Sequence, residues 1–251
     1  TSATLLHILT NGQSAKSVHS GEQAMLILDQ TPFYAESGGQ VGDIGSITCN
    51  QGVFDVTDTF KIKGNIYVHI GKMVEGVLTI NDKVKADIND EHRQHVMRNH
   101  SATHLMHKAL KETLGNHIEQ KGSLVDRYRT RFDFSHPKPL TPEEKTSIEL
   151  MVNQEILKNQ TTQAKVMDID AAKKTGAMML FGEKYGDQVR VLDIGNSKEL
   201  CGGTHVAKTG DIGLFKIQSE SGVSSGVRRI EATTGLNVIS LIKAQETVLD
   251  N

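Results

Sequence analysis

The sequence predicts an α+β fold, in which a small N-terminal β-barrel precedes a core of helices packed on a mainly antiparallel sheet. Short β-rich runs between Ala24 and Ile88 are separated by Gly, Asn and Asp at intervals of roughly 8 to 12 residues, a pattern typical of small barrels. A helical pattern begins at Asn89 and Asp90, and further helical and strand-like segments follow it. This succession of segments favours an α+β architecture.

The predicted elements follow in chain order. The barrel strands are the runs AMLIL, GSITC, VFDVTD, NIYVHI and KVKADI. A long helix then runs from a cap at Asn89 or Asp90 to Gly115, a residue suited to a left-handed helix end. A second helix starts at Thr141, which is followed by proline and, three residues on, by Glu144, as in a capping box. Later strands are expected at RFDF, QVRVLDI, GLFKIQS and VRRIEA.

Composition narrows the class of protein. The 251 residues are 37% hydrophobic, which is enough to form hydrophobic cores. The 28 basic and 30 acidic residues give a net charge of -2, which argues against a protein that coats nucleic acid non-specifically. With two distant cysteines, no leader and no apolar run near the roughly 20 residues of a membrane span, we expect a reduced, cytoplasmic protein without membrane contact. The start at Thr1 and the final helical run suggest a piece of a longer chain.

Two short motifs together predict a metal site. His100 and His104 lie four residues apart in the first long helix, a spacing that stacks them on one face with about 5 to 6 Å between Cβ atoms. About a hundred residues later, Cys201 and His205 flank two glycines that allow a tight turn. Cysteine and histidine are ligands that Zn²⁺ prefers, so the four residues form a possible set for one Zn²⁺ per chain.

Other interpretations remain open for these motifs. Eleven histidines make chance spacings common, and most histidines are only surface or core residues. Four protein ligands can also hold a purely structural zinc. Ligands so far apart in sequence argue mildly against this, because they suggest an ion that bridges a cleft, where zinc could promote hydrolysis of a substrate. Alternatively, Cys201 is a thiolate nucleophile activated by a neighbouring histidine, and the chain is a cysteine hydrolase.

A series of motifs in order carries a resemblance to a known family: TPFYAESGGQVGD, HSATH, QKGS, RFDFSH, LFGEKYGD, LCGGTH, TGDIGLF and SGVRRIEATTG. Over about Thr31 to Gly235 they closely resemble the editing region of bacterial alanyl-tRNA synthetase, which is similar to free-standing alanyl-tRNA deacylases and to the editing domain of threonyl-tRNA synthetase. The family's HxxxH and CxxxH zinc motifs fall on the four residues above, and all four are intact.

The resemblance implies a division of the chain and an activity. It implies a barrel domain over 1–89, a zinc-binding editing core over 90–235 and, over 236–251, the start of a helical linker to a C-terminal domain outside this chain. It implies hydrolysis of the ester that joins serine or glycine to the 3′ end of tRNA(Ala). The alternative is a tRNA-binding module with structural zinc.

Three further residues are candidates for the catalytic site. Gln120 matches a pocket position of the family, where its amide can hold a serine hydroxyl or a water, or it is a glutamine of a surface loop. Thr103 precedes a ligand and either faces the pocket or packs the helix. Asp133 stands in a strand-like run and is either an acceptor for a ligand histidine or a solvent-facing residue.

The tRNA end is expected to meet two other segments. Gly38, Gly39 and Gln40 predict a tight loop of the barrel domain that approaches the acceptor end. Arg228 and Arg229 are candidates for phosphate contacts, although charge runs are usually solvated faces. At a net charge of -2, binding to tRNA should be weak and strongly dependent on salt.

Overall fold

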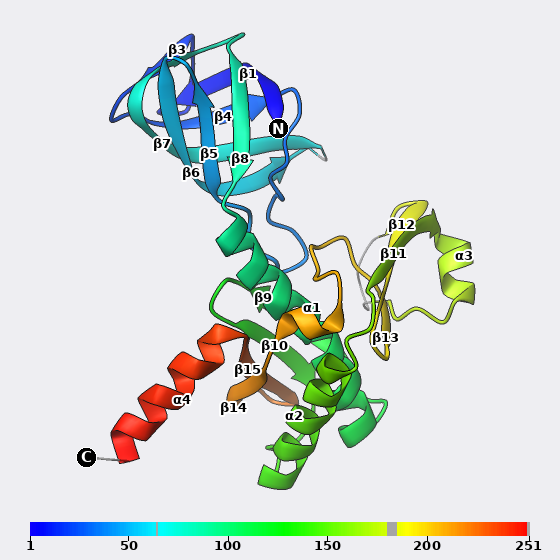
Figure 1. Ribbon diagram of the computed structural model, residues 1–251. Coiled ribbons are helices and arrows are strands. Elements are labelled where there is room, and N and C mark those ends of the chain that lie inside the picture. The colour runs from blue at the N-terminus through cyan, green and yellow to red at the C-terminus, as the bar shows by residue number, and fades with distance from the viewer. Residues whose placement is uncertain (64, 180–184, 250–251) are drawn as a thin grey trace. The chain divides into compact units, whose positions relative to one another are not determined.

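The structure is a computed structural model that describes residues 1–63, 65–179 and 185–249 (Figure 1). The chain forms two compact units, one comprising residues 1–37 and 41–93 and the other residues 38–40 and 94–251. Each unit has a hydrophobic core of its own. The α+β class predicted from the sequence, with its N-terminal barrel, is confirmed.

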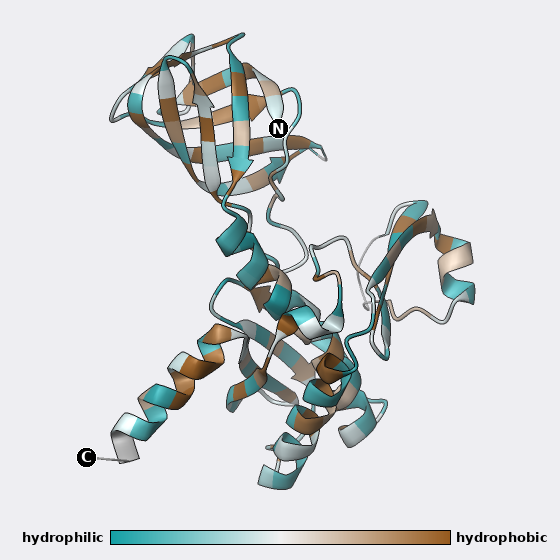
Figure 2. Ribbon diagram, in the orientation of Figure 1, coloured by the Kyte–Doolittle hydropathy of each residue, from teal (hydrophilic) through white to brown (hydrophobic). Residues whose placement is uncertain are grey.

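The first unit is a closed antiparallel barrel. Its strands pair in the order β1-β4-β7-β6-β5-β8, and β8 pairs with β1 to close the sheet. The six strands are β1 (Ser2–Thr10), β4 (Gln23–Leu28), β5 (Gly45–Cys49), β6 (Gly52–Ile62), β7 (Ile66–Thr79) and β8 (Lys83–Ile88). Two short strands, β2 (Gln13–Ala15) and β3 (Ser17–His19), pair onto β1 and β7. Because alternate side chains point inward, hydrophobic and hydrophilic residues alternate along several strands (Figure 2).

A closed barrel leaves no exposed sheet edge and fills its interior with side chains. In the barrel Leu5, Leu26, Ile47, Phe54 and Met73 are fully buried. The sequence pattern predicted five of the strands but not β1, β2 or β3.

The first long helix, α1, spans Asp90–Leu114. The side-chain oxygen of Asn89 accepts a hydrogen bond from the backbone N–H of His92 at 2.9 Å, which satisfies one of the free donors at the start of the helix. Gly115 follows the last turn with φ +119°, in the region that favours glycine. The helix therefore begins and ends where its sequence predicted.

The second unit packs α1 and α2 on a four-stranded antiparallel sheet (Figure 1). The sheet order is β14-β15-β10-β9, with β9 at Gln120–Val125, β10 at Thr130–Ser135, β14 at Phe215–Ser224 and β15 at Val227–Thr234. Helix α2 (Pro142–Leu157) has the predicted capping box between Thr141 and Glu144. Leu105, Phe132, Ile148 and Ile230 meet in the core between the helices and the sheet.

A smaller sheet completes the second unit. It consists of β11 (Gln163–Asp168), β12 (Gln188–Ile194) and β13 (Ser197–Leu200), and helix α3 (Ile169–Lys174) packs on it around a small core. A 3-10 turn, η1 (Thr209–Ile212), and helix α4 (Leu236–Leu249) follow. In the LFGEKYGD motif, residues 180–184 lie outside the described residues. Among the helices that the structure describes, none combines the length and apolar character needed to cross a membrane.

Candidate metal centre

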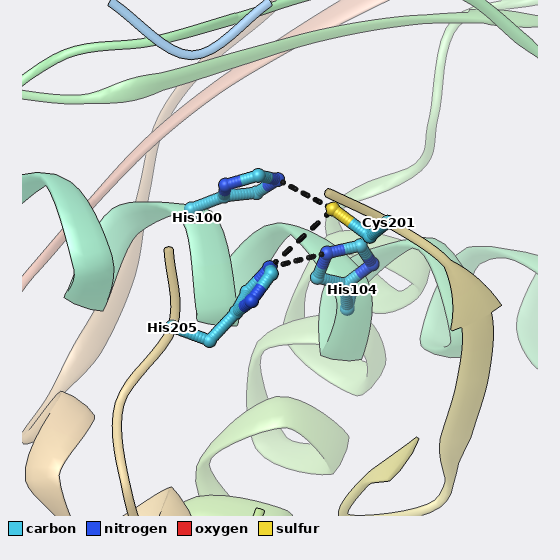
Figure 3. Close-up of side chains that lie close together, drawn as sticks. All are labelled: His100, His104, Cys201 and His205. Carbon is cyan, nitrogen blue, oxygen red and sulfur yellow. Dashed lines mark hydrogen bonds between the residues drawn. The ribbon is translucent and has the colours of Figure 1, made fainter. Parts of the chain in front are cut away.

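The structure brings together the four residues that the sequence singled out as metal ligands. His100 and His104 project from one face of α1, and Cys201 and His205 lie in the loop that follows β13 (Figure 3). One donor atom from each residue lies within 4.8 Å of the other three. His100 and His104 are buried, and Cys201 and His205 are partly buried. Two segments about a hundred residues apart thus converge on one point.

The spacing of the donor atoms fits a tetrahedral zinc. Cys201 Sγ lies 3.5 Å from the Nε2 atoms of both His100 and His205, and the Nε2 atoms of His104 and His205 are 3.2 Å apart. Zinc–nitrogen bonds of about 2.05 Å and zinc–sulfur bonds of about 2.3 Å at tetrahedral angles place two nitrogens about 3.3 Å apart and nitrogen and sulfur about 3.6 Å apart. The donor set and its spacing therefore suit Zn²⁺.

Two buried acceptors orient the ligand histidines from outside. Glu199, at the end of β13, accepts from His104 Nδ1 at 2.7 Å, and Gln40 Oε1 lies 2.7 Å from His100 Nδ1. An imidazole whose Nδ1 donates outward presents the lone pair of Nε2 inward, as a metal ligand must. The second oxygen of Glu199 also accepts from His107 Nδ1, at 3.0 Å.

The charges around the cluster hold two of its four residues in the form that binds metal. Burial raises the pKa of the Cys201 thiol, but the charges of His100 and His104 outweigh this and hold the pKa well below its usual value. Burial, with the charge of His100, lowers the pKa of His205 to about 3. Burial also lowers the pKa of His104, but Glu199 and Cys201 outweigh it and raise that pKa to about 10. At neutral pH Cys201 is thus a thiolate and His205 is neutral, the protonation states that metal ligands need, whereas His104 is protonated and must release a proton when a metal ion binds.

Three other contacts fix the loop that carries Cys201 and His205. Arg190, on β12, donates from one guanidinium nitrogen to the carbonyls of Cys201 and Gly203, at 3.1 and 2.8 Å. Ser101, on α1, accepts from the backbone N–H of Val206 at 3.0 Å. A Cβ on Gly203 would lie 2.2 Å from His100 Cε1, so only glycine allows the loop to approach the imidazole this closely.

A small cavity of about 40 Å³ adjoins the ligands. Gln120, Thr103 and Gly38 line it together with three of the four ligands. Its volume is enough for about three water molecules or a small amino-acid side chain. Thr103 Oγ1 donates to the carbonyl of Asn99 at 2.8 Å, so this hydroxyl is engaged within the helix. A larger cavity, of about 820 Å³, lies in the barrel unit, and none of the predicted site residues lines it.

The structure places Asp133 away from the role suggested by the sequence. Asp133 and Arg229 are directly opposite each other on β10 and β15. The Asp133 carboxylate accepts hydrogen bonds from Nε and NH2 of Arg229 at 2.7 and 2.8 Å. The carboxylate that meets a ligand histidine is Glu199. A lone acidic residue two positions before Cys201, in the run SKEL, was the signal for it in the sequence.

The segments expected to meet tRNA are also engaged within the protein. Arg229 pairs with Asp133, and Arg228 Nε donates to Glu220 Oε1 at 2.5 Å. Gly38, Gly39 and Gln40 belong to the second unit rather than to the barrel domain, because their contacts lie there. Gln40 is completely buried, so its side chain is not on the surface of a loop.

Comparison with known proteins agrees with the resemblance read from the motifs. Residues 1–92 match the family described as tRNA synthetases class II (A), and residues 189–231 match the Threonyl and Alanyl tRNA synthetase second additional domain. The second match contains Cys201 and His205, and lies in the unit that holds the cluster.

Curated relatives extend the match to nearly the whole chain. Alanine–tRNA ligase of Acidovorax sp. (strain JS42) is 55% identical over 99% of this chain, and those of Janthinobacterium sp. (strain Marseille) and Thiobacillus denitrificans are each 57% identical over 98% and 97%. The chain spans only 28% of the length of each of these relatives. The resemblance expected from the motifs is thus confirmed: along almost its entire length, the chain matches a segment of the alanine–tRNA ligases.

Proposed function

We propose that this chain hydrolyses the ester of serine or glycine on the 3′ end of tRNA(Ala), using one Zn²⁺ held by His100, His104, Cys201 and His205. The observation that carries the proposal is the convergence of these four donor atoms beside a small cavity, in a chain similar to a segment of alanine–tRNA ligases. Zn²⁺ held by these residues, with one of the four displaced, would polarise a carbonyl and lower the pKa of a bound water towards about 7. The reaction belongs to the cytoplasm, where tRNA is charged.

The need for such a site follows from the limits of binding. A pocket built for alanine cannot exclude the smaller glycine, and one methylene or hydroxyl gives discrimination of only about 1 to 3 kcal/mol. A second, hydrolytic site raises accuracy because it tests the amino acid again. The cavity beside the ligands is small enough to act as such a second test.

Two residues of the cavity are proposed to meet the substrate. Gln120 begins β9 and lines the cavity, so its amide is available as a donor or acceptor for the serine hydroxyl or an attacking water. Gly38 also lines the cavity, and a Cβ at this position would meet nothing within 4 Å, which leaves space beside it for the amino acid of the substrate. Thr103 is proposed to shape the cavity wall, since its hydroxyl is already bonded.

Contact with the tRNA phosphates is proposed to be weak. Arg228 and Arg229 are paired with carboxylates, so either arginine must exchange its partner before it can bind a phosphate. The net charge of -2 adds no general attraction for RNA. Each phosphate contact that does form would weaken as salt is raised.

The test is deacylation of serine-charged tRNA(Ala) by the purified chain, before and after verified removal of metal by a chelator. We expect turnover that is lost without metal and returns with Zn²⁺, while correctly charged alanine tRNA is spared. Unchanged turnover after metal removal would overturn the zinc mechanism. Binding of tRNA without any hydrolysis would favour the binding-module alternative.

A substitution separates the two roles open to Cys201. In Cys201→His the thiol is replaced by another zinc ligand that cannot act as a sulfur nucleophile. Metal binding and turnover retained in this variant would exclude the thiolate mechanism. If the variant retains metal but loses turnover, the result would support the thiolate mechanism and overturn our assignment of Cys201 as a metal ligand alone.

A further inference from the structure

The turn at Gly38-Gly39-Gln40 carries a buried amide with three hydrogen-bonding contacts. Gln40 Oε1 accepts from the backbone N–H of Thr204 at 2.9 Å, and Gln40 Nε2 donates to Thr204 Oγ1 at 2.8 Å. The third contact joins Oε1 to His100 Nδ1 at 2.7 Å. The side chain is 0% exposed. It therefore bridges α1 and the loop that carries the other two ligands.

These contacts determine which way the amide faces. A backbone N–H can only donate, so the Gln40 atom facing Thr204 N must be the oxygen. The same oxygen faces His100, so the hydrogen of a neutral imidazole must sit on Nδ1. Its Nε2 then carries the lone pair, and this is the atom that lies 3.5 Å from Cys201 Sγ. Gln40 thus selects the form of His100 that can bind metal.

Gly39 holds the turn in the position that this bridge requires. Gly39 has φ +85°, and a Cβ there would lie 2.5 Å from the carbonyl oxygen of Ser123. The backbone N–H of Val125, on β9, donates to Gly39 O at 2.7 Å. The turn is therefore fixed against β9, and the Gln40 side chain extends from a rigid base.

We infer that Gln40 is a positioning residue of the metal centre, whose side-chain amide holds His100 and the Cys201–His205 loop in register. The inference rests on the metal site of the proposed function, but it concerns metal affinity rather than hydrolysis. It replaces the contact with RNA that the GGQ motif suggested, because the Gln40 side chain is fully buried and contacts Thr204 and His100.

The test is titration of the metal-free 251-residue chain with Co²⁺ and Zn²⁺. We expect Gln40→Ala to weaken the affinity for both ions by about ten- to a hundredfold, the usual effect of removing a group that orients a ligand. Its Co²⁺ absorption bands should also shift, because the His100 ring is free to turn. Gln51→Ala, at an exposed glutamine of the barrel, is the control and should bind both ions as the unmodified protein does.

A conservative variant tests the oxygen itself. Gln40→Glu keeps an acceptor for His100 and for Thr204 N–H, so it should stay within about threefold of the unmodified affinity. Gln40→Asn keeps the amide but withdraws it by one methylene, and should weaken binding as Gln40→Ala does. This variant carries the test if Gln40→Ala fails to fold.

The outcomes separate this inference from the proposed function. If the unmodified chain binds Zn²⁺ and deacylates serine-charged tRNA, but Gln40→Ala and Gln40→Asn bind both ions unchanged, only the inference is overturned. It is equally overturned if Gln40→Glu loses as much affinity as Gln40→Ala, or if Gln40→Ala weakens tRNA binding while metal affinity stays constant. If the unmodified chain binds neither ion, the metal centre and the inference fail together.

Discussion

Replacing Gly203 by alanine is expected to push His100 away from the other ligands. A Cβ at this position would lie 2.2 Å from His100 Cε1 and 2.8 Å from Gln40 Oε1, whereas real Cβ contacts essentially never fall below 3.0 Å. The imidazole must therefore retreat by roughly 0.8 Å, which is several times the tolerance of about 0.2 Å in a metal–ligand distance. We expect the affinity for Zn²⁺ to fall by at least about a hundredfold.

The neighbouring glycine supplies the matched control. A Cβ on Gly202 would meet nothing within 4 Å, so Gly202→Ala adds the same methyl group one residue earlier without a clash. Affinity is measured by competition with a chromophoric chelator, and thermal unfolding of the metal-free proteins checks that both variants fold. If Gly203→Ala binds Zn²⁺ within about threefold of Gly202→Ala, the close approach to His100 has no bearing on the metal site and our reasoning is refuted.

Two further predictions concern stability. Thr141→Ala removes the capping box of α2 and should lower the free energy of unfolding by about 1 kcal/mol, measured by denaturant titration. Thr146→Ala, within the same helix, is the control and should change the free energy of unfolding little. Equal effects of the two substitutions would contradict the role of the cap. Without metal, stability should fall as pH drops from about 6.5 towards 3, because the unfolded chain protonates His205 while burial holds the folded pKa at about 3. His205→Asn should flatten this slope in thermal unfolding, and an unchanged slope would show that His205 is not its source.

Local sequence signals predicted much of the fold because the forces that act on these segments are local. The cap at Asn89, the glycine stop at Gly115 and the capping box at Thr141 each satisfy free backbone groups at a helix end, so residues a few positions apart decide them. Strands β11 and β13 carried weaker signals. β11 is largely exposed and has no clear alternation, and β13 has only four residues.

The sequence indicated the four residues that the structure brings together, but not the contacts that support them. Residue type and spacing indicated the four ligands, because Zn²⁺ accepts few kinds of side chain. Nothing local in the sequence shows that Gln40 reaches His100, since the contact spans 60 residues. Asp133 was assigned from its place in a strand, but its partner is decided by the register that sets it opposite Arg229. Long-range pairing, which depends on the complete fold, decides such contacts.

The wide separation of the ligands along the chain bears on when the site can form during biosynthesis. A nascent chain that has passed His104 offers two of the four donor atoms, and Cys201 and His205 leave the ribosome only about a hundred residues later. Until then α1 has two imidazoles without the loop that brings the other two donor atoms beside them. A chain that stops before residue 201 therefore lacks two of the four residues of the candidate metal centre.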